Sequence, residues 1–109
     1  MGSDALPVDQ QLTLEVARMI REFFLQQNAF HDVDTFSDLG LQYHMARAIL
    51  SFQEEAKKAI AGGAQLEDVV NIPARTDLMR GRFEKGYDER IGELVTEMGK
   101  QIAASMEAN

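Results

Sequence analysis

The chain has 109 residues, a length that suits a single hydrophobic core rather than two domains. Its 11 lysines and arginines against 18 aspartates and glutamates give a net charge of −7, which argues against a nucleic-acid partner because such proteins need a basic face. The absence of cysteine excludes disulfides and thiolate zinc sites, and no apolar run approaches the roughly 20 residues of a membrane-spanning helix, so no membrane insertion is expected.

The predicted fold class is all-α, because the sequence contains no alternating run of valine, isoleucine or threonine that would indicate strands. We expect a small helical bundle of two long antiparallel helices, short connecting helices and a long C-terminal helix. Residues 1–8 are interpreted as an N-terminal segment and residues 9–109 as one helical domain. The first long helix is predicted over residues 9–27, where apolar residues recur at spacings of three and four: Leu12, Val16, Met19, Ile20, Phe23 and Phe24.

Residues 28–36 have no helical period and are rich in side chains that bond their own backbone, which predicts an ordered loop. Either Thr35 or Ser37 can cap the second long helix, which is expected to end at Gly62-Gly63. Its predicted stripe consists of Leu39, Tyr43, Ala46, Ile49, either Phe52 or Gln53, Ala56 and Ile60.

Three further helical segments are predicted beyond the two glycines. One or two turns are expected over residues 66–70, followed by a short helix that begins at Pro73 and runs through Arg82. The last helix is expected to have about 20 residues. Its near-heptad spacing gives one continuous apolar seam made of Tyr87, Ile91, Leu94, Val95, Met98, Ile102 and Met106.

The residues alone indicate no catalytic and no metal site. His31 and His44 are thirteen positions apart, one in the loop and one on a helix, which favours packing or capping over metal binding. Asp32 and Asp34 could suggest a cation site or an acid–base pair, but turn formation is favoured because further oxygen ligands are missing at loop spacing. The phosphate-binding motif G-x-x-x-x-G-K-[ST] is also absent, so the chain by itself is not expected to be an enzyme or to hold a cofactor.

One long motif points to a known family. Residues 18–36 read RMIREFFLQQNAFHDVDTF, and agreement continues through Gln42-Tyr43, Ala48-Ile49-Leu50, Gly62-Gly63 and Ile72-Pro73-Ala74-Arg75. Over roughly residues 4–83, this pattern resembles the C-terminal helical region of the catalytic A subunit of V/A-type and vacuolar-type rotary ATPases. Beyond residue 83 only the helical character agrees.

The resemblance implies that residues 9–109 are the helical end of a longer subunit whose central domain carries the phosphate loop and binds ATP or ADP with Mg. In that family three A subunits alternate with three B subunits around a rotating shaft, and ATP synthesis or hydrolysis is coupled to proton or sodium transport. The implied partners are the rest of the A subunit, adjacent B subunits and the central shaft subunits. The implied location is cytoplasmic, peripheral to the membrane in the soluble head of the complex.

By similarity to the related F-type catalytic subunit, the resemblance places Phe30, Val33 and Phe36 at the adenine pocket of the intact subunit. Stacking on aromatic rings there would favour binding of a flat purine. The spacing alone favours a simpler interpretation, in which both rings fill the junction between the first two helices.

The resemblance also implies that the bundle transmits nucleotide-driven motion to the shaft. We place the shaft-facing end at residues 62–82, where Arg75, Arg80 and Arg82 are candidates to meet acidic residues of the shaft. Ordinary solvation of these arginines is the alternative.

A rival interpretation is a stand-alone helical adaptor or dimerisation module that binds a partner through the seam of residues 91–106. The two hypotheses differ in which apolar surface is open to solvent. A detached ATPase module should expose part of its first helix and loop, whereas an adaptor should expose the seam of its last helix.

Overall fold

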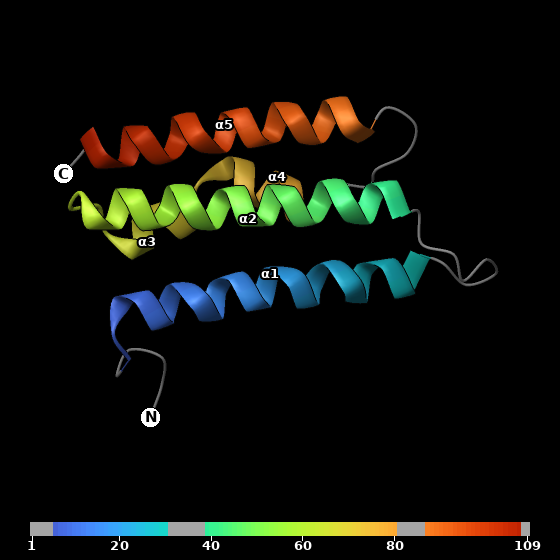
Figure 1. Ribbon diagram of the computed structural model, residues 1–109, viewed down its shortest axis with the longest axis horizontal. Helices are drawn as coiled ribbons and strands as arrows, with labels where there is room; N and C mark the ends of the chain where they lie inside the picture. Colours follow the sequence, from blue (N-terminus) through green and yellow to red (C-terminus); the bar gives the residue numbers. More distant parts are fainter. Residues whose placement is uncertain (1–5, 31–38, 81–86, 108–109) are drawn as a thin grey trace.

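The computed structural model describes residues 6–30, 39–80 and 87–107, with five helices and no strand among them. The long helices are α1 (Val8–Phe30), α2 (Leu39–Ala61) and α5 (Tyr87–Glu107), and the short ones are α3 (Leu66–Val70) and α4 (Pro73–Arg80). In Figure 1, α1 runs antiparallel to α2, while α5 lies on the other side of α2 and runs in the same direction as α2. The predicted all-α bundle of two long antiparallel helices, short connecting helices and a long last helix is confirmed.

The end of α1 corrects one predicted boundary. Residues 28–30 are helical, whereas the sequence predicts a loop from residue 28 onward. The helix continues because residues 24–30 contain neither glycine nor proline, and a single asparagine disfavours a helix only weakly. The predicted caps Thr35 and Ser37 lie outside the described residues, as does Arg82.

The end of α2 has the hydrogen bonds of a Schellman motif. The amide of Ala64 donates to the carbonyl of Ala59 at 2.9 Å, and the amide of Gly63 donates to the carbonyl of Ile60 at 3.0 Å. Gly63 has a φ of 108°, a conformation that side chains with a Cβ rarely adopt. The predicted stop at the glycine pair is therefore confirmed, and it turns the chain into α3.

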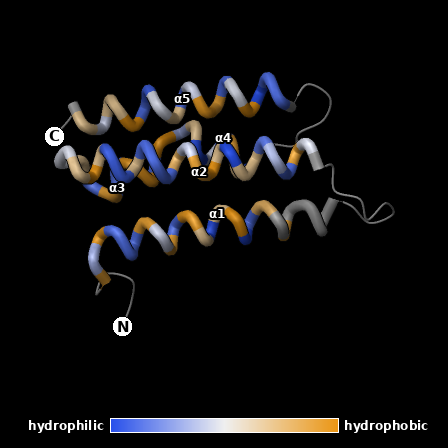
Figure 2. The backbone as a smooth tube through the Cα atoms, viewed as in Figure 1, coloured by the Kyte–Doolittle hydropathy of each residue, from blue (hydrophilic) through white to orange (hydrophobic). Residues whose placement is uncertain are grey.

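The core is formed by one face of every helix, and α5 packs extensively on α2. Figure 2 shows apolar residues recurring along the long helices at helical spacing. The buried side chains from the two outer long helices are Leu12, Val16, Met19, Phe23, Ile91, Leu94, Met98 and Ile102. Several members of the predicted stripes are exposed instead, namely Ile20, Tyr43, Ala46 and Met106, because the buried face of each helix is narrower than its apolar stripe.

A long-range hydrogen bond fixes the start of α4. The backbone amide of Ala74, in the first turn of α4, donates to Oε1 of Gln101 on α5 at 2.8 Å. First-turn amides have no partner within their own helix, so a side chain 27 residues further along supplies the cap. Pro73 needs no such partner because it has no amide hydrogen. The short helix α4 is therefore anchored to α5 at its first turn.

Candidate functional site

The predicted adenine-pocket residues belong to the junction between α1 and α2. Phe30 is the last residue of α1, but its side chain lies outside what the structure describes, as do Val33 and Phe36 altogether. The role of these three residues therefore stays a prediction. The structure does describe the two helices on either side of them. The last turn of α1 and the first turn of α2 lie at the same end of the bundle (Figure 1).

An open apolar hollow of about 240 Å³ lies between the halves of α1 and α2 that flank this junction. Ile20 and Phe23 line it from α1, and Ala46, Ile49 and Leu50 line it from α2. Leu50 is 56% exposed, and Tyr43, two turns earlier on the same stripe of α2, is also exposed. Large apolar side chains left open together on one face are typical of a surface that packs against another protein part.

The seam of the last helix lies in the interior. Ile91, Leu94, Met98 and Ile102 are each no more than 3% exposed, Val95 is half-buried, and Met106 near the helix end is open to solvent. The seam that the adaptor hypothesis requires is therefore already occupied by the chain's own core.

Arg75 joins four helices at one guanidinium group. Its Nη2 lies 2.7 Å from Oε2 of Glu15 on α1, and its Nη1 donates to the carbonyl of Val70 on α3 at 3.0 Å. The same group lies 5.6 Å from the ring centroid of Phe52 on α2. The side chain is only 16% exposed, so it holds α1, α2 and α3 to α4. The expectation that Arg75 faces outward to a partner is wrong, whereas Arg80 is exposed as expected.

The remaining candidate residues do not gather into a site. The rings of His44 and Tyr43 meet edge-on with centroids 5.5 Å apart, which fits the packing role predicted for His44. His31, Asp32 and Asp34 lie outside the described residues. Within the part of the chain that is described, no group of three histidine, aspartate or glutamate side chains is arranged to hold a metal ion.

Sequence comparison identifies the family. The family model for the C-terminal domain of V and A type ATP synthase matches residues 1–70, and the chain belongs to this family. The family predicted from the motif at residues 18–36 is thereby confirmed.

Among similar proteins are the A subunits of two A-type ATP synthases, that of Natronomonas pharaonis with 47% identity over 102 residues and that of Methanosarcina barkeri strain Fusaro with 40% over 104 residues. The V-type ATP synthase alpha chain 1 of Clostridium tetani is 42% identical over 107 residues. These alignments cover 94%, 95% and 98% of this chain but only 17%, 18% and 18% of the relatives. The chain thus corresponds to a small part of each relative.

Among the described helices, none has both the length and the apolar character that crossing a bilayer requires.

Proposed function

We propose that the chain forms the helical end of the catalytic A subunit of a V/A-type ATP synthase or ATPase. In the intact subunit Phe30, Val33 and Phe36 complete the adenine pocket, while the rest of the A subunit holds ATP or ADP with Mg. The bundle transmits nucleotide-driven motion to the central shaft, and the complex couples ATP synthesis or hydrolysis to proton or sodium transport. The partners are the rest of the A subunit, adjacent B subunits and the shaft, in the cytoplasmic head peripheral to the membrane.

The observation that carries this proposal is the open apolar hollow between α1 and α2. It lies beside the junction that contains Phe30, where the nucleotide-binding part of the subunit would pack. Covering a side chain as exposed as Leu50 would contribute on the order of 1 kcal/mol. The adaptor hypothesis needs an open seam on α5 instead, and that seam is buried.

The interior contacts support a mechanical role. A helical arm transmits motion only if its elements do not slide past one another, and close-packed interiors resist such sliding. Arg75 ties α4 to α1, α2 and α3, and Gln101 ties α4 to α5. Displacement at the end of α1 would therefore move the short helices with it.

The adenine-pocket assignment is tested in the complex of the full-length catalytic subunit with its B partner. Replacing both Phe30 and Phe36 by alanine should weaken binding of ADP and ATP by about 5- to 150-fold, because stacking on an aromatic ring contributes about 1–3 kcal/mol. Leu25→Ala is the matched control, since Leu25 lies on the same helix and is 60% exposed. Binding is measured by titration with a fluorescent adenine nucleotide.

Unchanged nucleotide affinity in the double variant, with helix content preserved by circular dichroism, would contradict the pocket assignment. The 109-residue chain alone should bind adenine negligibly and should not turn over ATP, because the phosphate-binding elements belong to the rest of the subunit.

A further inference from the structure

Arginines gather on one face of α1 and α4 although the chain as a whole is acidic. Of the chain's seven arginines, four line two adjoining hollows. The first hollow, of about 430 Å³, contains Arg18 and Arg21, and the second, of about 270 Å³, contains Arg18, Arg75 and Arg80. Because they share Arg18, we treat the two hollows as one feature, the arginine groove.

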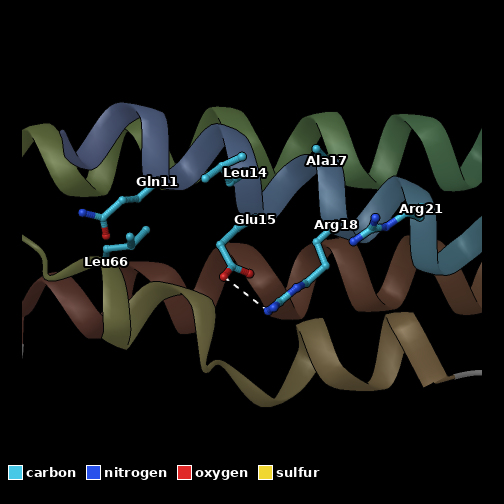
Figure 3. A pocket seen from close by; sticks show the side chains of 7 residues that line it. All are labelled: Gln11, Leu14, Glu15, Ala17, Arg18, Arg21 and Leu66. Carbon is cyan, nitrogen blue, oxygen red and sulfur yellow. Dashed lines mark ion pairs between the residues drawn. The ribbon is translucent and has the colours of Figure 1, made fainter. Parts of the chain in front are cut away.

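The arginine groove carries positive charge that the described residues do not neutralise. Its four arginines face two lining carboxylates, Glu15 and Glu22, which leaves a local excess of two positive charges in a chain of net charge −7. Glu15 is already engaged with Arg75 at 2.7 Å and with Arg18 at 3.6 Å, and Figure 3 shows Glu15 and Arg18 directed toward each other. Arg21 and Arg80 are exposed and have no ion-pair partner within the described ranges.

The two described arginines outside the groove, Arg47 and Arg90, both contact a partner on their own helix. Arg47 lies 5.7 Å from the ring centroid of Tyr43, and Arg90 pairs with Glu93 at 3.4 Å. Both find a partner one helical turn away on their own helix. Within the described chain, the guanidinium groups without an ion pair or a ring contact are therefore those of Arg21 and Arg80 in the groove, and guanidinium groups bind carboxylates in a bidentate geometry.

The length and lining of the arginine groove favour a polypeptide over a small anion. Its wall on α1 extends from Gln11 to Glu22, which is about 16 Å or three helical turns. Apolar side chains accompany the arginines: Leu14 is 49% exposed, and Leu66 of α3 also lines the first hollow. Phosphate or a nucleic-acid backbone would leave these apolar groups uncovered, whereas an amphipathic segment would cover them.

We propose that the arginine groove docks an acidic amphipathic segment of another polypeptide. Carboxylates of that segment pair with Arg21 and Arg80, and its apolar side chains cover Leu14. This surface is separate from the α1–α2 hollow and from Phe30, so the proposal goes beyond the adenine-pocket role and does not depend on it.

The experiment titrates the 109-residue chain with a synthetic three-turn peptide that carries glutamates on one helical face and leucines on the other. Fluorescence anisotropy gives the affinity, and amide chemical shifts of the labelled chain locate the site. The amphipathic peptide should bind at least tenfold more tightly than a peptide of the same composition in scrambled order. The shifts should concentrate on residues of α1 and α4.

Two pairs of variants separate groove binding from general charge attraction. Arg21→Glu with Arg80→Glu should weaken peptide binding at least tenfold, whereas Arg47→Glu with Arg90→Glu changes the net charge equally and should weaken it less than threefold. Leu14→Gln tests the apolar contact separately and should weaken binding about threefold or more. All five residues are exposed, so the fold is expected to persist and is checked by circular dichroism.

Several results would overturn the proposal. They are the absence of peptide binding at about 1 mM, equal binding of the scrambled peptide, or equal losses in the two charge-reversal pairs. Inorganic phosphate that produces the same chemical shifts and displaces the peptide would identify an anion site instead of a peptide groove.

Discussion

Replacing Arg75 by methionine removes three contacts while keeping most of the apolar stem. The charged hydrogen bond to the Val70 carbonyl contributes about 1.5–3 kcal/mol, and the contact with Phe52 contributes about 0.5–1 kcal/mol. We assign about 1–2 kcal/mol to the pair with Glu15, since a carboxylate that is 25% exposed is partly screened by solvent. The buried Nε of Arg75 has no hydrogen-bond partner in the described structure. Methionine removes this unpaired polar group, which offsets about 1–3 kcal/mol of the lost stabilisation.

The net loss of unfolding free energy for Arg75→Met is therefore expected to be about 2–3 kcal/mol, which corresponds to a fall in Tm of about 10–20 °C for a domain near 100 residues. Urea and thermal unfolding followed by circular dichroism measure both quantities. A double-mutant cycle with Glu15→Gln should give a coupling energy of about 1–2 kcal/mol, because the two side chains are in direct contact.

Arg90→Met is the matched control for Arg75→Met. Arg90 also pairs with a glutamate, but the side chains of Arg90 and Glu93 are 55% and 66% exposed, so its loss should cost less than about 0.5 kcal/mol. If Arg75→Met cost no more than Arg90→Met, or if no coupling to Glu15 appeared, the role of Arg75 in joining the helices would be refuted.

Three further substitutions test other features. Gly63→Ala should destabilise the chain by about 1–2 kcal/mol in thermal unfolding, because Gly63 has a positive φ. Gly92→Ala within α5 is the control and should stabilise the chain by up to about 1 kcal/mol. Equal effects of the two substitutions would contradict the turn geometry at Gly63. Gln101→Leu should cost about 1–3 kcal/mol and speed hydrogen exchange of the Ala74 amide, and unchanged exchange would disprove the cap. Leu50→Glu should alter the unfolding free energy by less than about 0.5 kcal/mol because Leu50 is 56% exposed, and a large loss of stability would show that Leu50 is a core residue.

Most of the fold could be predicted from the sequence because amphipathic helices show a local periodicity of apolar residues. The recurrences around Leu12 and Phe52 indicated the two long helices, and Gly62-Gly63 marked the end of the second. The predicted loop began too early, at residue 28, since polar composition alone does not end a helix. The exposure of Tyr43 was missed as well, because periodicity shows which residues share a face but not how much of that face a neighbour covers.

The contacts around Arg75 could not be predicted from local pattern. Its partner Glu15 lies 60 residues away, and nothing in the spacing of either residue distinguishes it from a solvated charge. The same applies to Gln101 and Ala74, which are 27 residues apart. By contrast, Phe30, Val33 and Phe36 were selected through family resemblance, so their assignment depends on the intact subunit rather than on any pattern within these 109 residues.

The cap on α4 has a consequence for biosynthesis. Gln101 follows α4 in the chain, so the ribosome has already released α4 and most of α5 before the Ala74 amide can find its acceptor. The helix that packs extensively on α2, α5, also emerges after the other four described helices. The α5-facing side of α2 therefore stays exposed to solvent in the nascent chain until α5 has left the ribosome, and chaperones can bind this apolar surface during that interval.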